Sequence, residues 1–237
     1  MRTTQGFEDT VVKTGAVLYS SILQWNASRL MGAMATVSAD TVLAARMAAV
    51  TAKIKASADA LLWNESAGMF MASTGIERDR IDVWANAFAG ASGFASAVQS
   101  RAIFEFVSQN ERGLFFEGQL RQLPAPQQWA VAIGHQDIDG KWAGNPTGPA
   151  SVAGSTVVTY QNGGYWATPL HHMLPFLALY DRSMACRLLN ESVASFRSHG
   201  INEWVGPFWP AASAGSPGYV ASAGSVFFAS EHLRCWE

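Results

Sequence analysis

Charged side chains are scarce: Asp, Glu, Lys and Arg make up 14% of the 237 residues, with 16 basic groups against 18 acidic ones. This near balance argues against a nucleic-acid groove, which needs a basic excess to neutralise phosphates. Disorder over most of the chain is also excluded, because disordered segments are poor in aromatics, whereas this chain has 11% aromatics and nine Trp. The length allows one large domain or two small ones.

Long apolar runs and cysteines are equally few. No run reaches the roughly 18–20 apolar residues of a membrane span, since Lys13 and several Ser and Gly interrupt residues 11–25. The N-terminus lacks the basic patch, apolar core and cleavage site of a signal peptide. Cys186 and Cys235 could form one bridge but no disulfide framework. We expect no membrane span, and a reducing compartment, the cytoplasm, is the better expectation for a location that otherwise stays unknown.

The common signatures of metal, nucleotide and hydrolase sites are missing. The sequence contains no CxxC pair, HExxH, GxSxG, P-loop or GxGxxG. On a helix, the adjacent His171 and His172 would point about 100° apart, so we expect one to be packed and the other exposed. Asp137 and Asp139 lack the downstream acidic ligands of a calcium loop and indicate a turn. We therefore predict neither a metal nor a cofactor.

Helical periodicity is abundant, and period-2 alternation is almost absent. A Gly-, Pro- and Gln-rich stretch at 111–159 has no period, and a loop of that length in a compact domain is usually functional or disordered. Its Trp129 and Trp142 favour an ordered, functional loop. We predict an all-α fold of helical hairpins with long connections. The helices are expected over 9–35, over 39–63 with Ser38 as N-cap, from 82 to about 106, and over 169–179, 182–198 and 221–233.

Several carboxylates lie in aromatic, Gly-rich segments. Asp9 lies in GFEDTVVKTG (6–15), Asp82 precedes Trp84, and Glu203 precedes Trp204. Sugar rings stack on aromatic faces, and their hydroxyls bind carboxylates, amides and Arg. Glycoside hydrolysis needs one protonated and one ionised carboxylate. This assortment predicts a carbohydrate site, to which other segments add Arg121, Gln161, Asn162, Tyr165 and Trp166.

Each of these residues also has a purely structural interpretation. Asp9 and Asp82 could be helix N-caps, and Glu203 could be a solvated loop carboxylate. Trp84 and Trp166 lie on helical stripes that are more often core than ligand platforms. Arg121, in GQLRQLP (118–124), could face solvent or pair with a substrate.

Four segments, in the same order, resemble motifs of the six-hairpin glycosidases, the (α/α)6-barrel superfamily. The branch concerned holds processing α-glucosidases, mannosylglycerate hydrolases and trehalases. LLWNESAGMF (61–70) resembles the end of a barrel helix, and NGGYWATPLHHML (162–174) resembles the pocket segment "YWRGPIWP" without its Arg. GINEWVGPF (200–208) with SPGYVASAGS (216–225) resembles the late "GxxxExYxP" loop and the final helix. GFEDTVVKTG resembles the acid loop, although only a Gly, one hydrophobe and the Asp agree.

The resemblance implies roles for individual residues. Asp9, with Glu8 as a neighbouring rival, becomes the general acid, and Glu203 becomes the base that activates water. This branch inverts, so the two carboxyl groups should lie roughly 6.5–9.5 Å apart. The acid should have a raised pKa. Asp82 has no secure counterpart. The residues implied to line the pocket are Gln161, Asn162, Tyr165, Trp166, Trp204 and Tyr219.

The resemblance also implies an incomplete barrel. A complete (α/α)6 toroid has twelve helices, whereas six or seven are expected here, so residues 1–237 resemble a single domain, the C-terminal part of a catalytic domain. An open half-toroid exposes apolar helix faces, and a missing N-terminal half or a second copy could cover them. We expect an oligo- or disaccharide substrate, low activity and marginal stability for the lone chain.

Two other functions fit the sequence. One is a carbohydrate-binding relative that has lost catalysis. The other is an all-α prenyl-transfer barrel, but ERDRID (77–82) matches its Asp-rich magnesium motif poorly, and pyrophosphate would require more basic residues.

Overall fold

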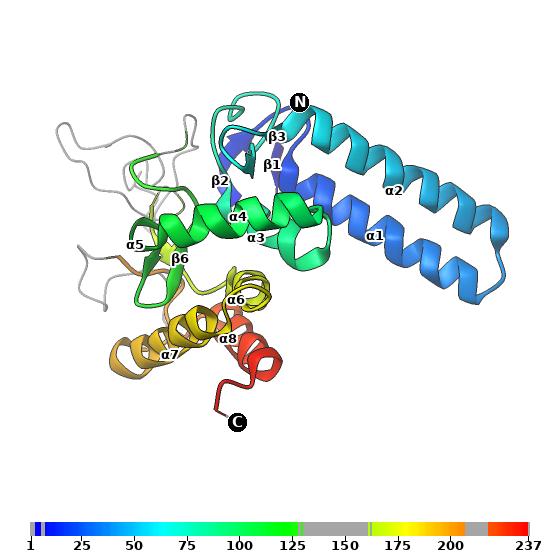
Figure 1. The fold of residues 1–237 in the computed structure, drawn as a ribbon. Helices are drawn as coiled ribbons and strands as arrows, with labels where there is room; N and C mark the ends of the chain where they lie inside the picture. The colour runs from blue at the N-terminus through cyan, green and yellow to red at the C-terminus, as the bar shows by residue number, and fades with distance from the viewer. Residues whose placement is uncertain are drawn as a thin grey trace, which may run out of the picture.

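The computed structural model describes residues 3–5, 8–127, 129, 161, 163–206 and 218–236, with the backbone alone for residues 3–10 and 12. This part of the chain is mostly helical (Figure 1), which confirms the all-α prediction. The helices are α1 Leu18–Val37, α2 Thr41–Leu62, α3 Val83–Ser92, α4 Ala97–Gln109, α5 Glu111–Leu114, α6 Leu170–Ala178, α7 Arg182–His199 and α8 Val220–Leu233.

Short antiparallel strands join these helices into three small sheets. The sheets have the orders β1-β2, β3-β4 and β5-β6-β7. The last of these connects chain segments that are far apart in sequence, because β6 pairs with β7 across about 45 residues of chain. The strands are β1 Thr3–Gln5, β2 Glu8–Lys13, β3 Trp63–Asn64, β4 Met69–Phe70, β5 Phe115–Phe116, β6 Gln119–Arg121 and β7 Tyr165–Trp166.

The prediction of a helix over residues 9–35 was wrong for its first turns. Residues 8–13 form β2, and α1 begins only at Leu18. Val11 and Val12 are β-branched and favour a strand. Gly15 then adopts a φ of +79°, and an added Cβ there would meet the Thr74 hydroxyl at 2.3 Å. A helix cannot pass through this left-handed position, so the chain turns before α1 starts.

Helices α1 and α2 form a long hairpin that extends away from the other helices (Figure 1). The N-cap of α2 is Asp40, whose side chain accepts a hydrogen bond of 2.9 Å from the Leu43 amide, and not the predicted Ser38. Apolar side chains at the far end of the hairpin are exposed, among them Met34, Val37 and Val42. The prediction of exposed apolar helix faces is in keeping with this hairpin.

The predicted third helix is two helices. Helix α3 ends at Gly93, which has a φ of +76°, and α4 starts after Ser96. The Ser96 side chain accepts from the Gln99 amide, and the Gln99 side chain accepts from the Ser96 amide. This capping box starts a new helix, so the apolar stripe continues across a break that periodicity alone does not reveal.

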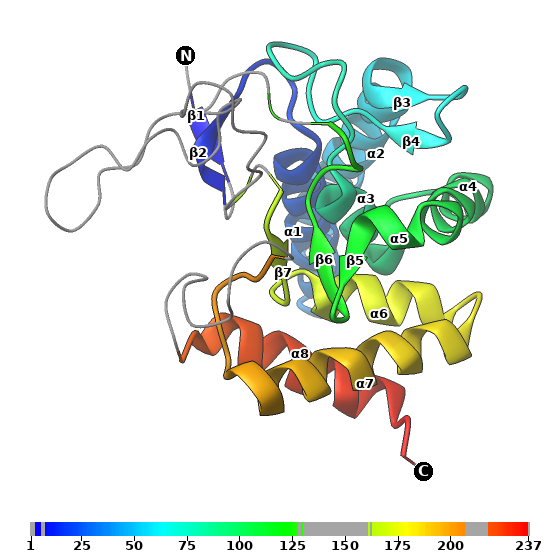
Figure 2. The same cartoon turned by 90° about the vertical axis from the view of Figure 1, so that its left-hand side faces the viewer.

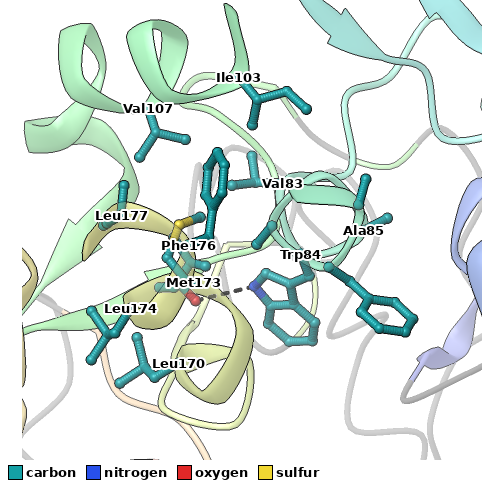
Figure 3. Packing of buried hydrophobic residues seen from close by; sticks show 14 of the residues in the cluster. Val83, Trp84, Ala85, Ile103, Val107, Leu170, Met173, Leu174, Phe176 and Leu177 are labelled. Atoms are coloured by element: carbon teal, nitrogen blue, oxygen red, sulfur yellow. Dashed lines mark hydrogen bonds between the residues drawn. The ribbon is translucent and has the colours of Figure 1, made fainter. Parts of the chain in front are cut away.

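Helix α3 lies at the centre of the main hydrophobic cluster. Every residue from Val83 to Gly90 is buried, as expected for a helix with neighbours on all sides. Helices α3 and α6 pack closely, since a Cβ on Gly90 would lie 2.4 Å from the Phe176 ring. Figure 3 shows the α3 side chains facing those of α6 and α4 across this core.

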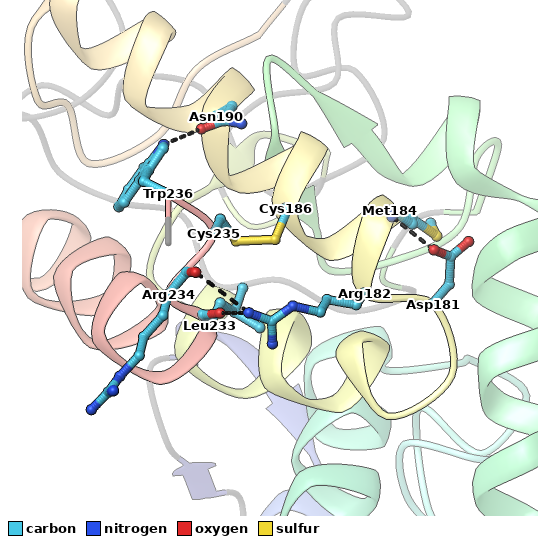
Figure 4. The surroundings of a disulfide bond; sticks show 9 residues. All are labelled: Asp181, Arg182, Met184, Cys186, Asn190, Leu233, Arg234, Cys235 and Trp236. Carbon is cyan, nitrogen blue, oxygen red and sulfur yellow. Dashed lines mark hydrogen bonds between the residues drawn. A yellow bond between two sulfur atoms is a disulfide. The ribbon is translucent and has the colours of Figure 1, made fainter.

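Helices α6, α7 and α8 form a second layer below α3 and α4 (Figure 2). A disulfide between Cys186 on α7 and Cys235 just after α8 joins the two outer helices (Figure 4). Arg182 donates to the carbonyls of Leu233 and Arg234 beside it. Disulfides persist in oxidising compartments, so the bridge corrects our preference for a reducing one.

Both histidines of α6 are half-buried, which corrects the expectation of one packed and one exposed ring. The His172 ring stacks on Phe88, with 4.3 Å between centroids. The His171 ring lies 3.7 Å from the His172 ring and its Nδ1 is 2.6 Å from the Thr168 carbonyl oxygen. Burial, followed by the charge of His171, lowers the pKa of His172 from 6.5 to about 3.

This depressed pKa predicts an acid-sensitive contribution to stability. Below pH 6.5 the unfolded His172 takes up a proton, whereas the folded one does so only near pH 3. The free energy of unfolding should therefore fall with falling pH in this window, by up to about 1.4 kcal/mol per unit. Urea unfolding between pH 7 and 4 should show a flatter profile for His172→Phe. The exposed His232→Gln variant is the control, and equal slopes for both variants would contradict the prediction.

Candidate functional site

Three of the segments singled out in the sequence meet at one sheet edge. Strands β6 and β7 pair so that Arg121 lies opposite Tyr165 and Leu120 opposite Trp166. Tyr165 in turn exchanges two backbone hydrogen bonds with Val205, of 2.9 and 2.8 Å. Residues 118–124, the pocket segment around Trp166 and the loop of Glu203 are therefore neighbours in space. This juxtaposition is what a shared site requires.

The tryptophans of these segments lie in the hydrophobic core. Trp84, Trp166 and Trp204 are 6, 2 and 8% exposed and belong to the main cluster. The Trp84 and Trp166 rings meet edge-on, with centroids 5.6 Å apart. Trp84 Nε1 donates to the Leu120 carbonyl at 3.4 Å (Figure 3). Their described contacts fit the structural interpretation, and sugar contact stays a prediction.

Asp82 lies at the buried N-terminus of α3 and is 1% exposed. Its Oδ1 accepts from the Ala85 amide at 3.0 Å, so it caps α3 as the structural interpretation predicted. Its Oδ2 pairs with Lys13 Nζ at 2.6 Å, and this ammonium lies 4.4 Å from the centroid of the Trp129 ring. The buried ion pair thus ties β2 to the start of α3.

Sequence reasoning missed three partners in this cluster: Lys13, Gln122 and Trp129. Trp129 Nε1 donates to Gln122 Oε1 at 3.3 Å and to the Gln161 carbonyl at 3.2 Å. The predicted residue Gln161 is 1% exposed and is held here through its backbone. The available signal was Trp129 itself, a Trp in a segment without periodicity; for Lys13, a lone cation in an apolar stretch was the only indication.

Arg121 is buried, contrary to the solvent-facing alternative, and it lies on a strand and not in a loop. Its Nη2 donates to the Gln127 carbonyl at 3.2 Å. Burial lowers the pKa of Arg121, and its interaction and hydrogen bond with Tyr165 partly offset this effect. Tyr165 also contacts Phe116, with ring centroids 5.5 Å apart. A guanidinium and a phenol thus lie next to the loop of Glu203.

The remaining candidates are placed less fully. Glu203 is half-buried, two residues before Val205. Tyr219 directly precedes α8, and its amide donates to the Ile201 carbonyl at 3.2 Å, which brings it close to the same loop. Asp9 lies on the backbone of β2, four residues before Lys13. Asn162 lies outside the described residues.

Within the described ranges, no cluster of His, Cys, Asp or Glu could hold a metal ion. None of the described helices is long and apolar enough to cross a membrane. The chemistry that these residues offer is that of carboxylates, a guanidinium, a phenol and amides. Such groups bind hydroxyls and transfer protons.

Comparison with known proteins identifies the fold. No family model and no curated sequence matches the chain. A GH63 mannosylglycerate hydrolase from Thermus thermophilus, in complex with Tris and D-glycerate, superposes with a TM-score of 0.59 at 13% identity over 90% of this chain and 44% of that one. The same enzyme with glucose gives 0.57 at 13% identity over 92% and 47%. A sialidase gives 0.59 at 15% identity over 81% and 17%.

These structures confirm the predicted resemblance at the level of the fold. The chain has the helical-hairpin fold of the six-hairpin glycosidases, and it spans less than half the length of the mannosylglycerate hydrolase structures that it matches. It therefore contains part of an (α/α) toroid, as the helix count indicated.

Proposed function

We propose, starting from this six-hairpin glycosidase fold, that the chain is part of a glycoside hydrolase that cleaves its substrate by an inverting mechanism. The observation that carries the proposal is the pairing of Arg121 with Tyr165 and of Tyr165 with Val205. This pairing places the Glu203 loop beside the segment that resembles the pocket of these enzymes. The neighbours' fold supports a carbohydrate-active hydrolase in general terms.

In this proposal Glu203 is the general base and Asp9 is the general acid. A base that activates water must be ionised and must reach the water from the face opposite the leaving group. The half-buried position of Glu203 is compatible with such a role. Asp82 takes no proton-transfer role, because its carboxylate pairs with Lys13 and caps α3. It would position β2, the strand that carries Asp9.

Hydrolysis of a panel of aryl glycosides and disaccharides tests the proposal. Glu203→Gln should lower kcat by roughly 10^3-fold or more, because the amide cannot accept a proton from water. Glu105→Gln, which removes an exposed carboxylate on α4, should leave turnover unchanged. The assays should use this chain and any longer product of the same reading frame. Turnover in Glu203→Gln equal to that of the unaltered protein would remove Glu203 from the mechanism.

A second function is a carbohydrate-binding relative without catalysis. The observation in its favour is that the chain covers 44% of the length of the hydrolase structure. This alternative predicts sugar binding that survives Glu203→Gln and no turnover at any pH. Calorimetric titration with the same sugars separates the two functions.

A further inference from the structure

Arg121 is a buried cation whose hydrogen-bonding capacity is only partly used. It is 6% exposed, and a guanidinium carries five N–H donors. One nitrogen, Nη2, donates to the Gln127 carbonyl, and Tyr165 provides a side-chain hydrogen bond. The Nε nitrogen is buried and has no hydrogen-bond partner.

The other fully buried cation of the described chain differs in this respect. Lys13 is paired with Asp82 at 2.6 Å, whereas none of the ion pairs among the described residues includes Arg121. A buried charge without a counterion is costly, and it persists where another group is present to offset that cost. Neutral partners, a backbone carbonyl and a phenol, leave most of the cost of Arg121 standing.

The position of Arg121 indicates where such a group would come from. Its direct cross-strand partner is Tyr165, and Tyr165 is bridged to Val205, two residues after Glu203. The unsatisfied guanidinium therefore belongs to the same sheet edge as the proposed base. A planar guanidinium binds a carboxylate with two parallel N–H···O bonds.

We propose that Arg121 binds a carboxylate group of the substrate, so that the chain acts on a glycoside bearing an acidic group. This inference rests on the proposed function for the word substrate, but the carboxylate site itself does not depend on catalysis. A neutral sugar would satisfy the remaining donors with hydroxyls and leave the charge without a counterion.

Calorimetric binding of D-glucuronate and D-glucuronamide to the unaltered protein tests the site. The two probes have the same ring and differ in the charge of one group. We expect glucuronate to bind at least about 10-fold more tightly, in line with the gain from a charged hydrogen bond. Equal binding of both probes, or tighter binding of the amide, would overturn the proposal.

Variants place the effect at Arg121. Arg121→Gln should abolish the preference for glucuronate, and Arg121→Lys should keep part of it, because the ammonium retains the charge but not the fork. Circular dichroism establishes that each variant is folded, and the probe pair on the unaltered protein stands even if one is not. A preference that persists in a folded Arg121→Gln variant would also overturn the assignment. Carboxylate binding without hydrolysis of any glycoside would refute the proposed function and leave this site in place.

Discussion

Replacing Lys13 by Met lowers the free energy of unfolding by about 3–5 kcal/mol, the usual cost of leaving one member of a buried ion pair without its partner. The Lys13 and Asp82 side chains are 2 and 1% exposed and lie 2.6 Å apart. Met fills a similar volume, so the loss is mainly electrostatic. Because Asp82 caps α3 and Lys13 ends β2, the variant should also loosen the junction of these two elements. Urea or guanidinium unfolding followed by circular dichroism measures the change.

A half-exposed pair on α2 provides the matched control. Lys55 pairs with Asp59, and these side chains are 25 and 39% exposed. Lys55→Met should cost about 1 kcal/mol or less, because solvent screens such pairs. In the double variant Lys13→Met/Asp82→Asn the unpaired charge is gone and Asn can still cap α3, so part of the stability should return. A loss for Lys13→Met no larger than that for Lys55→Met would contradict the importance of the buried pair.

Gly118→Ala should destabilise the protein by about 3 kcal/mol or more, the sum of a conformational cost and an overpacking cost. Gly118 follows Glu117 in the tight turn between β5 and β6, and both have positive φ, +71° and +49°. An added Cβ would lie 2.2 Å from the Leu188 carbonyl oxygen and 2.5 Å from the Ser192 amide nitrogen, both on the backbone of α7. The conformational cost of a left-handed Ala is about 1–2 kcal/mol, and the overlap with α7 adds the cost of overpacking, typically about 1–3 kcal/mol.

Gly93 separates the two contributions. Its φ is +76°, close to that of Gly118, but an added Cβ would have no atom within 4 Å. Gly93→Ala should therefore show the conformational cost alone, about 1–2 kcal/mol. The difference between the two variants, measured by chemical unfolding, reports how closely the β5–β6 turn docks on α7. If both variants lose the same stability, the turn can move away from α7 at little cost.

The prediction from sequence succeeded where a local pattern and the tertiary environment agree. The boundaries of α2, α6, α7 and α8 followed from apolar spacing and from punctuation such as Gly200, which ends α7. It was wrong at residues 9–17 and 93–96, where apolar spacing runs through a Gly with positive φ. Hydrophobic periodicity records burial on one face, and it does not record whether the backbone between buried residues is continuous.

The candidate site shows the same division. The order of four short motifs was enough to predict the superfamily fold, because that order follows the succession of helices along the chain. The roles of Asp9 and Glu203 are still proposals. The pairing of Lys13 with Asp82 joins residues 69 positions apart, and no periodicity or spacing in the sequence relates them.

By itself, then, the sequence determined the helical class, the partial toroid and the segments that carry polar chemistry, since these depend on composition, local spacing and motif order. The tertiary structure alone decided which polar groups are buried and with which partners. It showed the Cys186–Cys235 bridge, the capping and ion-pairing role of Asp82, and the incompletely satisfied Arg121. The physical reason is that burial and pairing depend on contacts between residues distant in sequence, whereas helix formation is largely settled by near neighbours.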